Sequence, residues 1–150
     1  MSDVGRKMRC IMPNDHEYRK GLHLRYQILR QPWGQPVGSE LDEIESESWH
    51  KVIITEQGEV VGSGRLHRVD TYTGQIRYMA IAESCQGQGL GRVLLAGLEQ
   101  QAVELGMNEV MLQSRENQTG FYVKLGYQDV GAGHTLFGSI AHRKMVKVLG

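Results

Sequence analysis

The segment Gln86 to Gly91, with the sequence Gln-Gly-Gln-Gly-Leu-Gly, constrains the fold of this chain more than any other feature. It separates a strand-like run over 75–82 from a helix-like run over 90–105. The alternating glycines leave a backbone with few side chains in the way. The start of the following helix adds unpaired N–H groups and the positive end of a helix dipole. This arrangement predicts a diphosphate site, and therefore a nucleotide-like cofactor. The alternative is an ordinary glycine-rich turn before a helix.

Length, charge and cysteine usage narrow the class of protein. A chain of 150 residues predicts one domain over 1–150. The 17 basic and 17 acidic residues balance, which argues against a nucleic-acid partner or an anionic membrane surface. Cys10 and Cys85 form no CxxC pair, so we expect no disulfide framework and a reducing cytoplasm.

Several kinds of site and segment are not expected. No apolar run approaches the roughly 20 residues that cross a bilayer, and the first seven residues lack the apolar core of an export signal. The six histidines show no metal-binding spacing such as HExxH, and the carboxylates show no calcium-loop pattern. We therefore predict no membrane segment and no metal.

Hydrophobic periodicity and turn residues predict the element order β-α-β-β-β-α-β-α-β-β. Asp15 is the expected cap of the first helix, and Pro32 and Gly34 are expected to end it. Strands joined by both hairpins and crossovers predict a mixed, mostly antiparallel sheet with helices on both faces, a three-layer α/β/α sandwich. The expected strands are 7–12, 51–56, 59–66, 75–82, 109–114, 127–131 and 135–148, and the expected helices are 15–30, 90–105 and 117–125.

Two familiar phosphate-binding patterns do not fit the glycine segment. A dinucleotide fingerprint needs G-x-G-x-x-G in the first βα unit, whereas Gly87, Gly89 and Gly91 have the spacing G-x-G-x-G and lie past the middle of the chain. A Walker loop ends in Gly-Lys-Ser/Thr, but Gly91 is followed by Arg92 and Val93. A different diphosphate-containing ligand is therefore expected.

Two motifs resemble those of the GNAT superfamily of N-acetyltransferases, which bind acetyl-CoA. Gln86-x-x-Gly89-x-Gly91 resembles its Gln/Arg-x-x-Gly-x-Gly/Ala signature, and Phe-Tyr-Val-Lys-Leu-Gly-Tyr over 121–127 resembles a second signature, one helix and one strand later. The resemblance covers roughly 50–148 and more weakly the whole chain. The segments 24–34 and 140–145 resemble a subgroup of small predicted acyltransferases, although Ala141 replaces its usual proline.

The resemblance implies an acetyl-CoA-dependent N-acetyltransferase in which an amine attacks directly, through a tetrahedral intermediate and without an acyl-enzyme. Main-chain N–H groups over 87–92 would bind the diphosphate, and the Gln86 side chain can add a donor. The strand before the loop would bind the pantetheine arm, and the N–H of Ile81 can face the acetyl oxygen. Asn117 can cap a helix and contact acetyl-CoA, although many family members place this asparagine where the chain has Arg115. The implied cofactor-binding residues are Met79, Ala80, Ile81, Gln86, Gly87, Gln88, Gly89, Leu90, Gly91, Arg92, Asn117 and Tyr122.

The same resemblance assigns the proton transfers. Tyr122 is implied as the acid that protonates the departing sulfur, the alternative being a packed aromatic beside Phe121. Glu83, acting through water, and His142 are candidates for the base, or no base is needed. The catalytic candidates are thus Tyr122, His142 and Glu83.

The acceptor stays open. The five acids over 40–47 either attract a cationic amine or form a solvated helix face, and four residues are candidates for the acceptor pocket. Acceptors compatible with the resemblance are a small-molecule amine or a peptide amine, and a homodimer is compatible too. A non-catalytic acyl-CoA-binding module and a nucleotide-binding oxidoreductase are the alternative functions. The candidate pocket residues are Tyr26, Arg30, Trp33 and His50.

Overall fold

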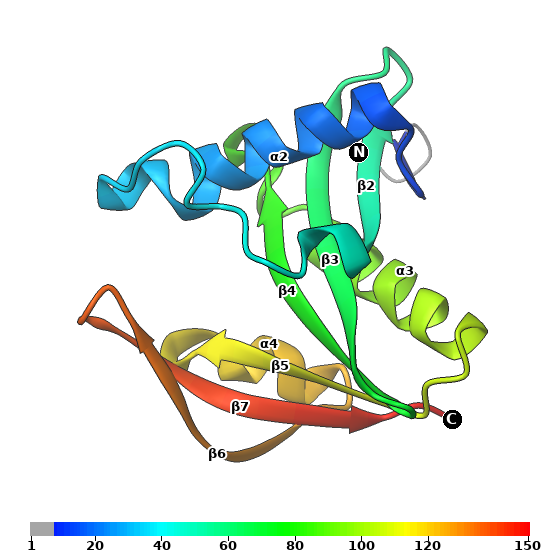
Figure 1. The fold of residues 1–150 in the computed structure, drawn as a ribbon, viewed down its shortest axis with the longest axis vertical. Coiled ribbons are helices and arrows are strands. Elements are labelled where there is room, and N and C mark those ends of the chain that lie inside the picture. Colours follow the sequence, from blue (N-terminus) through cyan, green and yellow to red (C-terminus); the bar gives the residue numbers. More distant parts are fainter. Residues whose placement is uncertain (1–7) are drawn as a thin grey trace.

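The structure is a computed structural model that describes residues 8–150. Its centre is one seven-stranded sheet with the strand order β1-β2-β3-β4-β5-β7-β6, in which only β4 and β5 pair in parallel (Figure 1). This confirms the predicted mixed, mostly antiparallel sheet. The strands are β1 (Met8–Ile11), β2 (Trp49–Thr55), β3 (Val60–Asp70), β4 (Thr73–Ile81), β5 (Glu109–Arg115), β6 (Gln128–Leu136) and β7 (Ile140–Val148).

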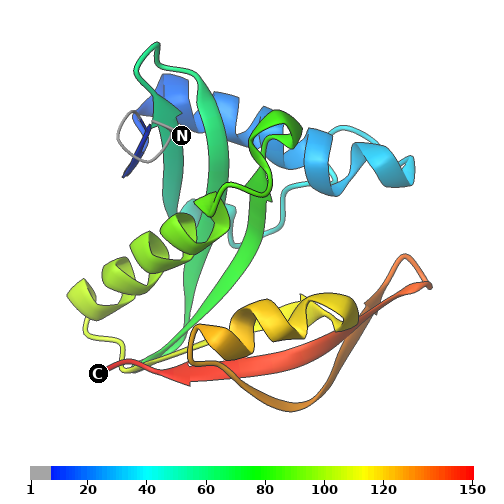
Figure 2. The same ribbon diagram turned by 180° about the vertical axis from the view of Figure 1, so that it is seen from behind.

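Helices cover both faces of this sheet and make the predicted three layers. In Figure 1 helix α2 lies in front of β2, β3 and β4, while α3 lies behind them; Figure 2 brings α3 and α4 to the front. The helices are α2 (Asp15–Leu29), α3 (Leu90–Glu104) and α4 (Thr119–Lys124), with 3-10 turns η1 (Gln31–Trp33), η2 (Glu45–Glu47), η3 (Glu83–Cys85) and η4 (Glu116–Gln118). None of the helices within this range is long and apolar enough to cross a membrane.

The core lies between α3 and the sheet. The sequence predicts an apolar stripe of Leu90, Leu94, Leu98, Ala102 and Leu105 on this helix. The first four are at most 3% exposed, and Leu105, at the C-cap, is half-buried. Gly64 on β3 makes this contact close, because a Cβ there would lie 2.8 Å from a methyl carbon of Leu98. The absence of a side chain on the strand therefore lets the helix approach the sheet.

The N-cap of helix α2 lies one residue earlier than predicted. Its cap is Asn14, whose side-chain oxygen accepts the Glu17 N–H at 2.9 Å, while the Glu17 carboxylate accepts the Asn14 N–H at 3.0 Å. This capping box satisfies two donors at once, so Asn14 outcompetes Asp15 for the position. Asp15 lies in the first turn.

The last hairpin turns later than predicted. Strand β6 continues to Leu136, and the turn lies at 137–139 with Phe137 and Gly138 at positive φ. Gly131 and Gly133, which suggested an earlier turn, instead lie at two register irregularities in the β6–β7 pair. Strand β3 also continues past the predicted Leu66, because its pairing with β4 runs as far as Asp70. Lys7, the expected start of the first strand, and the rest of the segment examined for an export signal lie outside the described residues.

The sheet divides where β4 and β5 separate. They pair only from Thr73 to Ile76, after which β4 stays with β3 and β5 stays with β7. Tyr78 lies at a bulge just beyond this point, with φ +58 in a region that tyrosine rarely adopts. The two arms diverge from the vertex near the β3–β4 turn in both views (Figures 1 and 2). Every functional feature below lies around this divergence.

Candidate active site

A cleft of about 890 Å³ opens where the two arms diverge. Its walls come from the second half of β4, the end of β5, the first residues of α3 and α4, the end of α2, and the β6–β7 hairpin. A cleft of this size holds a cofactor-sized ligand. Elements from both halves of the chain meet here, as expected for a site at the carboxyl ends of parallel strands.

The glycine loop supplies a row of unpaired donors beside the cleft. Gln86 and Gly91 line the cleft, and the other predicted loop residues lie outside its wall: Gly87, Gln88, Gly89, Leu90 and Arg92. The six N–H groups from Gly87 to Arg92 have no acceptor among the described residues, and α3 starts without a side-chain cap. Gly87 and Gly89 adopt φ +80, and a Cβ built on either meets nothing within 4 Å. Such a loop at a helix N-terminus has a geometry that can accept an anion.

The Gln86 side chain makes one bond within the protein. Its amide nitrogen donates one of its two N–H groups to the Ile81 carbonyl at 3.0 Å, which leaves the other for a ligand. The bond ties the start of the loop to the end of β4. Gln86 also lines the cleft.

The exposed edge of β4 presents main-chain donors to the cleft. Ala82 donates its N–H to the Val61 carbonyl on β3 at 2.8 Å. Because successive peptide groups of a strand point in opposite directions, the N–H of Ile81 points away from β3 toward the cleft. Ile81 and Met79 line the cleft, while Ala80 is 2% exposed and also borders it.

Tyr122 lines the cleft from α4 and is packed as well. Its ring makes edge-to-face contacts with Phe121 at 4.9 Å and Tyr127 at 5.8 Å between centroids. Its hydroxyl makes no hydrogen bond to a described residue. Burial raises the pKa of Tyr122, so the hydroxyl keeps its proton at neutral pH. Tyr122 can therefore be both a packed aromatic residue and a proton donor.

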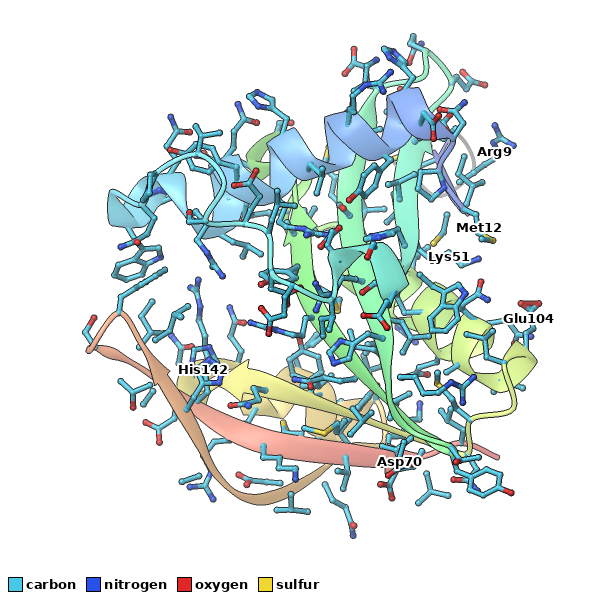
Figure 3. All side chains as sticks on the ribbon, in the orientation of Figure 1. Arg9, Met12, Lys51, Asp70, Glu104 and His142 are labelled. Atoms are coloured by element: carbon cyan, nitrogen blue, oxygen red, sulfur yellow. The ribbon has the colours of Figure 1, made fainter. Side chains whose placement is uncertain are left out.

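His142 enters the cleft from β7. Its Nδ1 lies 2.9 Å from the Ile140 carbonyl, and its ring stacks on His134 at 4.4 Å between centroids. A carbonyl only accepts, so Nδ1 carries the proton and Nε2 has the free lone pair in the neutral ring. Figure 3 shows the labelled His142 rising from the β7 arm toward the space between the arms. His134 was missed from the sequence because the irregular β6–β7 pairing places it there.

Of the two predicted site residues Glu83 and Asn117, only Asn117 lines the cleft. Glu83 is exposed on η3 and is not part of the cleft wall. Asn117 lines the cleft from η4. It does not cap α4: the cap position belongs to Gln118, without a side-chain bond, so the expected cap is wrong.

The acidic stretch divides into two kinds of residue: Asp42 and Glu45 pair with interior arginines, whereas Glu43 and Glu47 are exposed. Asp42 binds Arg65 through both oxygens, at 2.7 and 2.9 Å, and Glu45 accepts from Arg25 at 2.9 Å. Arg25 and Arg65 are fully buried. The bond from Arg65 holds the pKa of Asp42 below its ordinary value. These acids neutralise interior arginines, which the sequence could not reveal because the partners lie 20 or more residues away.

The bulged Tyr78 is the centre of what we call the Tyr78 cluster, a group that sequence reasoning missed. Four guanidinium carbons lie 4.5–5.5 Å from the centroid of its ring. Cationic groups at this distance are attracted to an aromatic face. The alternation of residues along a strand does not predict the bulge that orients the Tyr78 ring. The arginines are Arg25, Arg30, Arg65 and Arg77.

Of the four residues predicted to line an acceptor pocket, only Arg30 lines the cleft. Tyr26 donates to the Gln35 carbonyl at 2.8 Å and anchors the turn after α2. Trp33 is 42% exposed and contacts Phe137. His50 lies 3.4 Å from the carboxylate of Glu45. Within residues 8–150 no group of three histidine, cysteine or acidic side chains is placed to hold a metal.

Comparison with known proteins decides the family. The profile described as the acetyltransferase (GNAT) family matches residues 19–127, well over half of the chain. The chain belongs to the GNAT family. Both motifs that carried the resemblance lie within the matched segment.

Relatives and solved structures agree with the GNAT assignment. An uncharacterized N-acetyltransferase of Bacillus subtilis, YjcF, is 26% identical over 91% of this chain and 96% of its own length. A candidate N-acetyltransferase from Lactobacillus plantarum has the same fold, with a TM-score of 0.86 at 18% identity over 96% of this chain and 99% of its own. An aminoglycoside 6'-N-acetyltransferase complexed with coenzyme A gives 0.75 at 18% identity, over 93% and 96%.

Proposed function

We propose that this GNAT protein transfers an acetyl group from acetyl-CoA to a primary amine. The observation that carries the proposal is the row of six unpaired N–H groups over 87–92 at the start of α3. An unpaired row of donors is costly unless water or a ligand accepts from it. A diphosphate supplies the required acceptor oxygens and negative charge.

The rest of the cleft fits the remainder of acetyl-CoA. The open edge of β4 over 79–81 offers main-chain groups to the amides of a pantetheine arm, while the Ile81 N–H is left for the acetyl oxygen. Open space beside Gly87 and Gly89 leaves room for phosphates. The coenzyme A complex of the aminoglycoside acetyltransferase, a protein of the same fold, supports this choice of ligand.

The cleft offers this reaction an acid, a candidate base and an oxyanion donor. The amine nitrogen attacks the thioester carbon, so that a C–N bond forms and the C–S bond breaks. The Ile81 N–H faces the carbonyl oxygen as charge develops on it. Tyr122 gives its proton to the departing sulfur, and Nε2 of His142 takes one from the amine. Glu83 is left out because it lies outside the cleft.

The binding step is tested by adding a carboxylate to the loop without straining it. Gly91 is suited to this, since its φ is not positive and a Cβ there meets only Phe121, at 3.6 Å. Gly89 is unsuitable, because φ +80 would strain any side chain. Ala96→Glu adds the same charge to an exposed position on α3 and serves as the control.

Acetyl-CoA should raise the melting temperature of the wild-type protein and of Ala96→Glu, because a ligand that binds the native state stabilises it. Gly91→Glu should fold normally and lose this shift. An equal shift in Gly91→Glu would contradict the diphosphate site. Release of free CoA thiol with a panel of amines separates an enzyme from a module that only binds acyl-CoA.

A further inference from the structure

The cleft is cationic. Arginines and histidines line it, and no aspartate or glutamate among residues 8–150 does. The acids that contact the arginines around Tyr78 are already paired: Asp42 accepts from Arg65 and Arg77, and Glu45 from Arg25. A polycationic acceptor would therefore meet like charge without a free counter-charge. The basic residues of the wall are Arg30, Arg77, Arg115, His134 and His142.

Arg30 is buried without a counter-charge in the part of the chain that the structure describes. It is 7% exposed, and its guanidinium donates to the Ser39 carbonyl at 3.0 Å and the Leu29 carbonyl at 3.1 Å. No carboxylate among the described residues pairs with it, whereas Arg65 has Asp42 on both of its terminal nitrogens. A buried cation held only by neutral groups is costly unless an anion arrives.

Arg77 lies beside Arg30 at the same wall. Both contact the Tyr78 ring, with guanidinium carbons 4.5 Å and 5.5 Å from its centroid. Arg77 makes a single 3.2 Å bond to Asp42, and its side chain is 33% exposed. Arg77 therefore has donors left for a ligand, and Tyr78 holds the two cations together.

The position of this pair fits the acceptor and not the diphosphate. Arg30 follows the end of α2 and reaches the ring of Phe137, 5.4 Å away, in the β6–β7 hairpin. Helix α2 covers the sheet face opposite α3, and the glycine loop leads directly into α3 (Figures 1 and 2). The diphosphate site and the arginine pair thus belong to opposite sides of the sheet.

We propose that the amine acceptor carries a carboxylate, which Arg30 and Arg77 bind. The inference rests on the proposed acetyl transfer and names the class of acceptor. Arginine suits this role because its planar fork matches the two oxygens of a carboxylate. Binding the carboxylate there fixes the acceptor at one end and leaves its amine directed into the cleft.

The experiment compares amino acids with their decarboxylated amines, such as phenylalanine with phenethylamine and lysine with cadaverine. Thiol release from acetyl-CoA gives kcat/KM for each pair. The wild-type protein should prefer the carboxylated member by about 10- to 100-fold, the range expected for hydrogen bonds to a charged group. Arg30→Gln and Arg77→Gln should each reduce this ratio toward one. Arg19→Gln, at an exposed position on α2, is the control and should keep it.

A second readout separates this proposal from the acetyl transfer itself. Thermal shifts are measured with each pair of amines in the absence of acetyl-CoA. A stabilising shift from the carboxylated members that Arg30→Gln or Arg77→Gln removes supports the anion site, whether or not thiol is released. A preference for the decarboxylated members in either assay overturns it, as does an equal response to both members. Loss of the acetyl-CoA shift alone would refute only the proposed transfer.

Discussion

The proposed acid can be tested by removing the hydroxyl group from each of two neighbouring tyrosines, Tyr122 and Tyr127, in turn. Tyr122 has a hydroxyl without a partner among the described residues, whereas the hydroxyl of Tyr127 donates to Glu99 at 2.8 Å. Their rings touch edge to face, so both share one packing environment. Removing each hydroxyl should therefore separate catalysis from stability.

Tyr122→Phe should lower kcat by about 100- to 10,000-fold, the usual contribution of a positioned acid, or about 3–5 kcal/mol in the barrier. Its melting temperature and its acetyl-CoA shift should stay near those of the wild type, since no internal hydrogen bond is lost. The assay is thiol release under saturating acetyl-CoA, with thermal unfolding measured on the same samples.

Tyr127→Phe should behave in the opposite way. It loses a hydrogen bond to a carboxylate that Lys147 still neutralises at 3.0 Å, which costs about 2 kcal/mol. For a chain of this length that corresponds to about 4–8 °C in melting temperature. Turnover should hardly change. Wild-type turnover in Tyr122→Phe, or an equal loss in both variants, would refute the assignment of the acid.

The remaining predictions concern stability. Burial lowers the pKa of His50 and His67, so the unfolded chain protonates first and stability should fall as pH drops below about 6.5. The Arg65 bond lowers the pKa of Asp42, so a further loss should follow below about 4, and a melting temperature constant from pH 7 to 3 would contradict both signs. Leu98→Ala removes a fully buried side chain and should cost about 3 kcal/mol in denaturant unfolding. Val93→Ala, at a 44% exposed position on the same helix, should cost less than about 0.5 kcal/mol; similar losses in both would show that α3 does not pack as described.

Local patterns predicted most of the elements. The stripe from Leu90 to Ala102 is a helix face because its period is helical, and the glycine loop lies where a strand gives way to that helix. The last hairpin was misplaced because glycine signals a turn and a bulge equally well, and only pairing with β7 distinguishes them. The cap at Asn14 was missed by one residue for a similar reason, since neighbouring polar residues compete for it.

The wall of the cleft opposite α3 was much harder to predict. Arg30 was proposed as a pocket residue, but Arg77, Tyr78 and His134 were not. Their positions depend on a bulge, on register irregularities and on contacts between residues far apart in the chain. The acids were misread because charge in a sequence does not tell which charges are paired.

The sequence by itself determined the element order, the core stripe of α3 and the loop whose N–H groups lack partners, because each depends on backbone preferences within a few residues. Tertiary structure decided how β4 and β5 separate and which acids pair with Arg25 and Arg65. It also decided that the cleft wall carries basic side chains and no acidic ones among the described residues. Those outcomes depend on pairing register and on electrostatic contacts across 20 or more positions, and neither has a local signature in the chain.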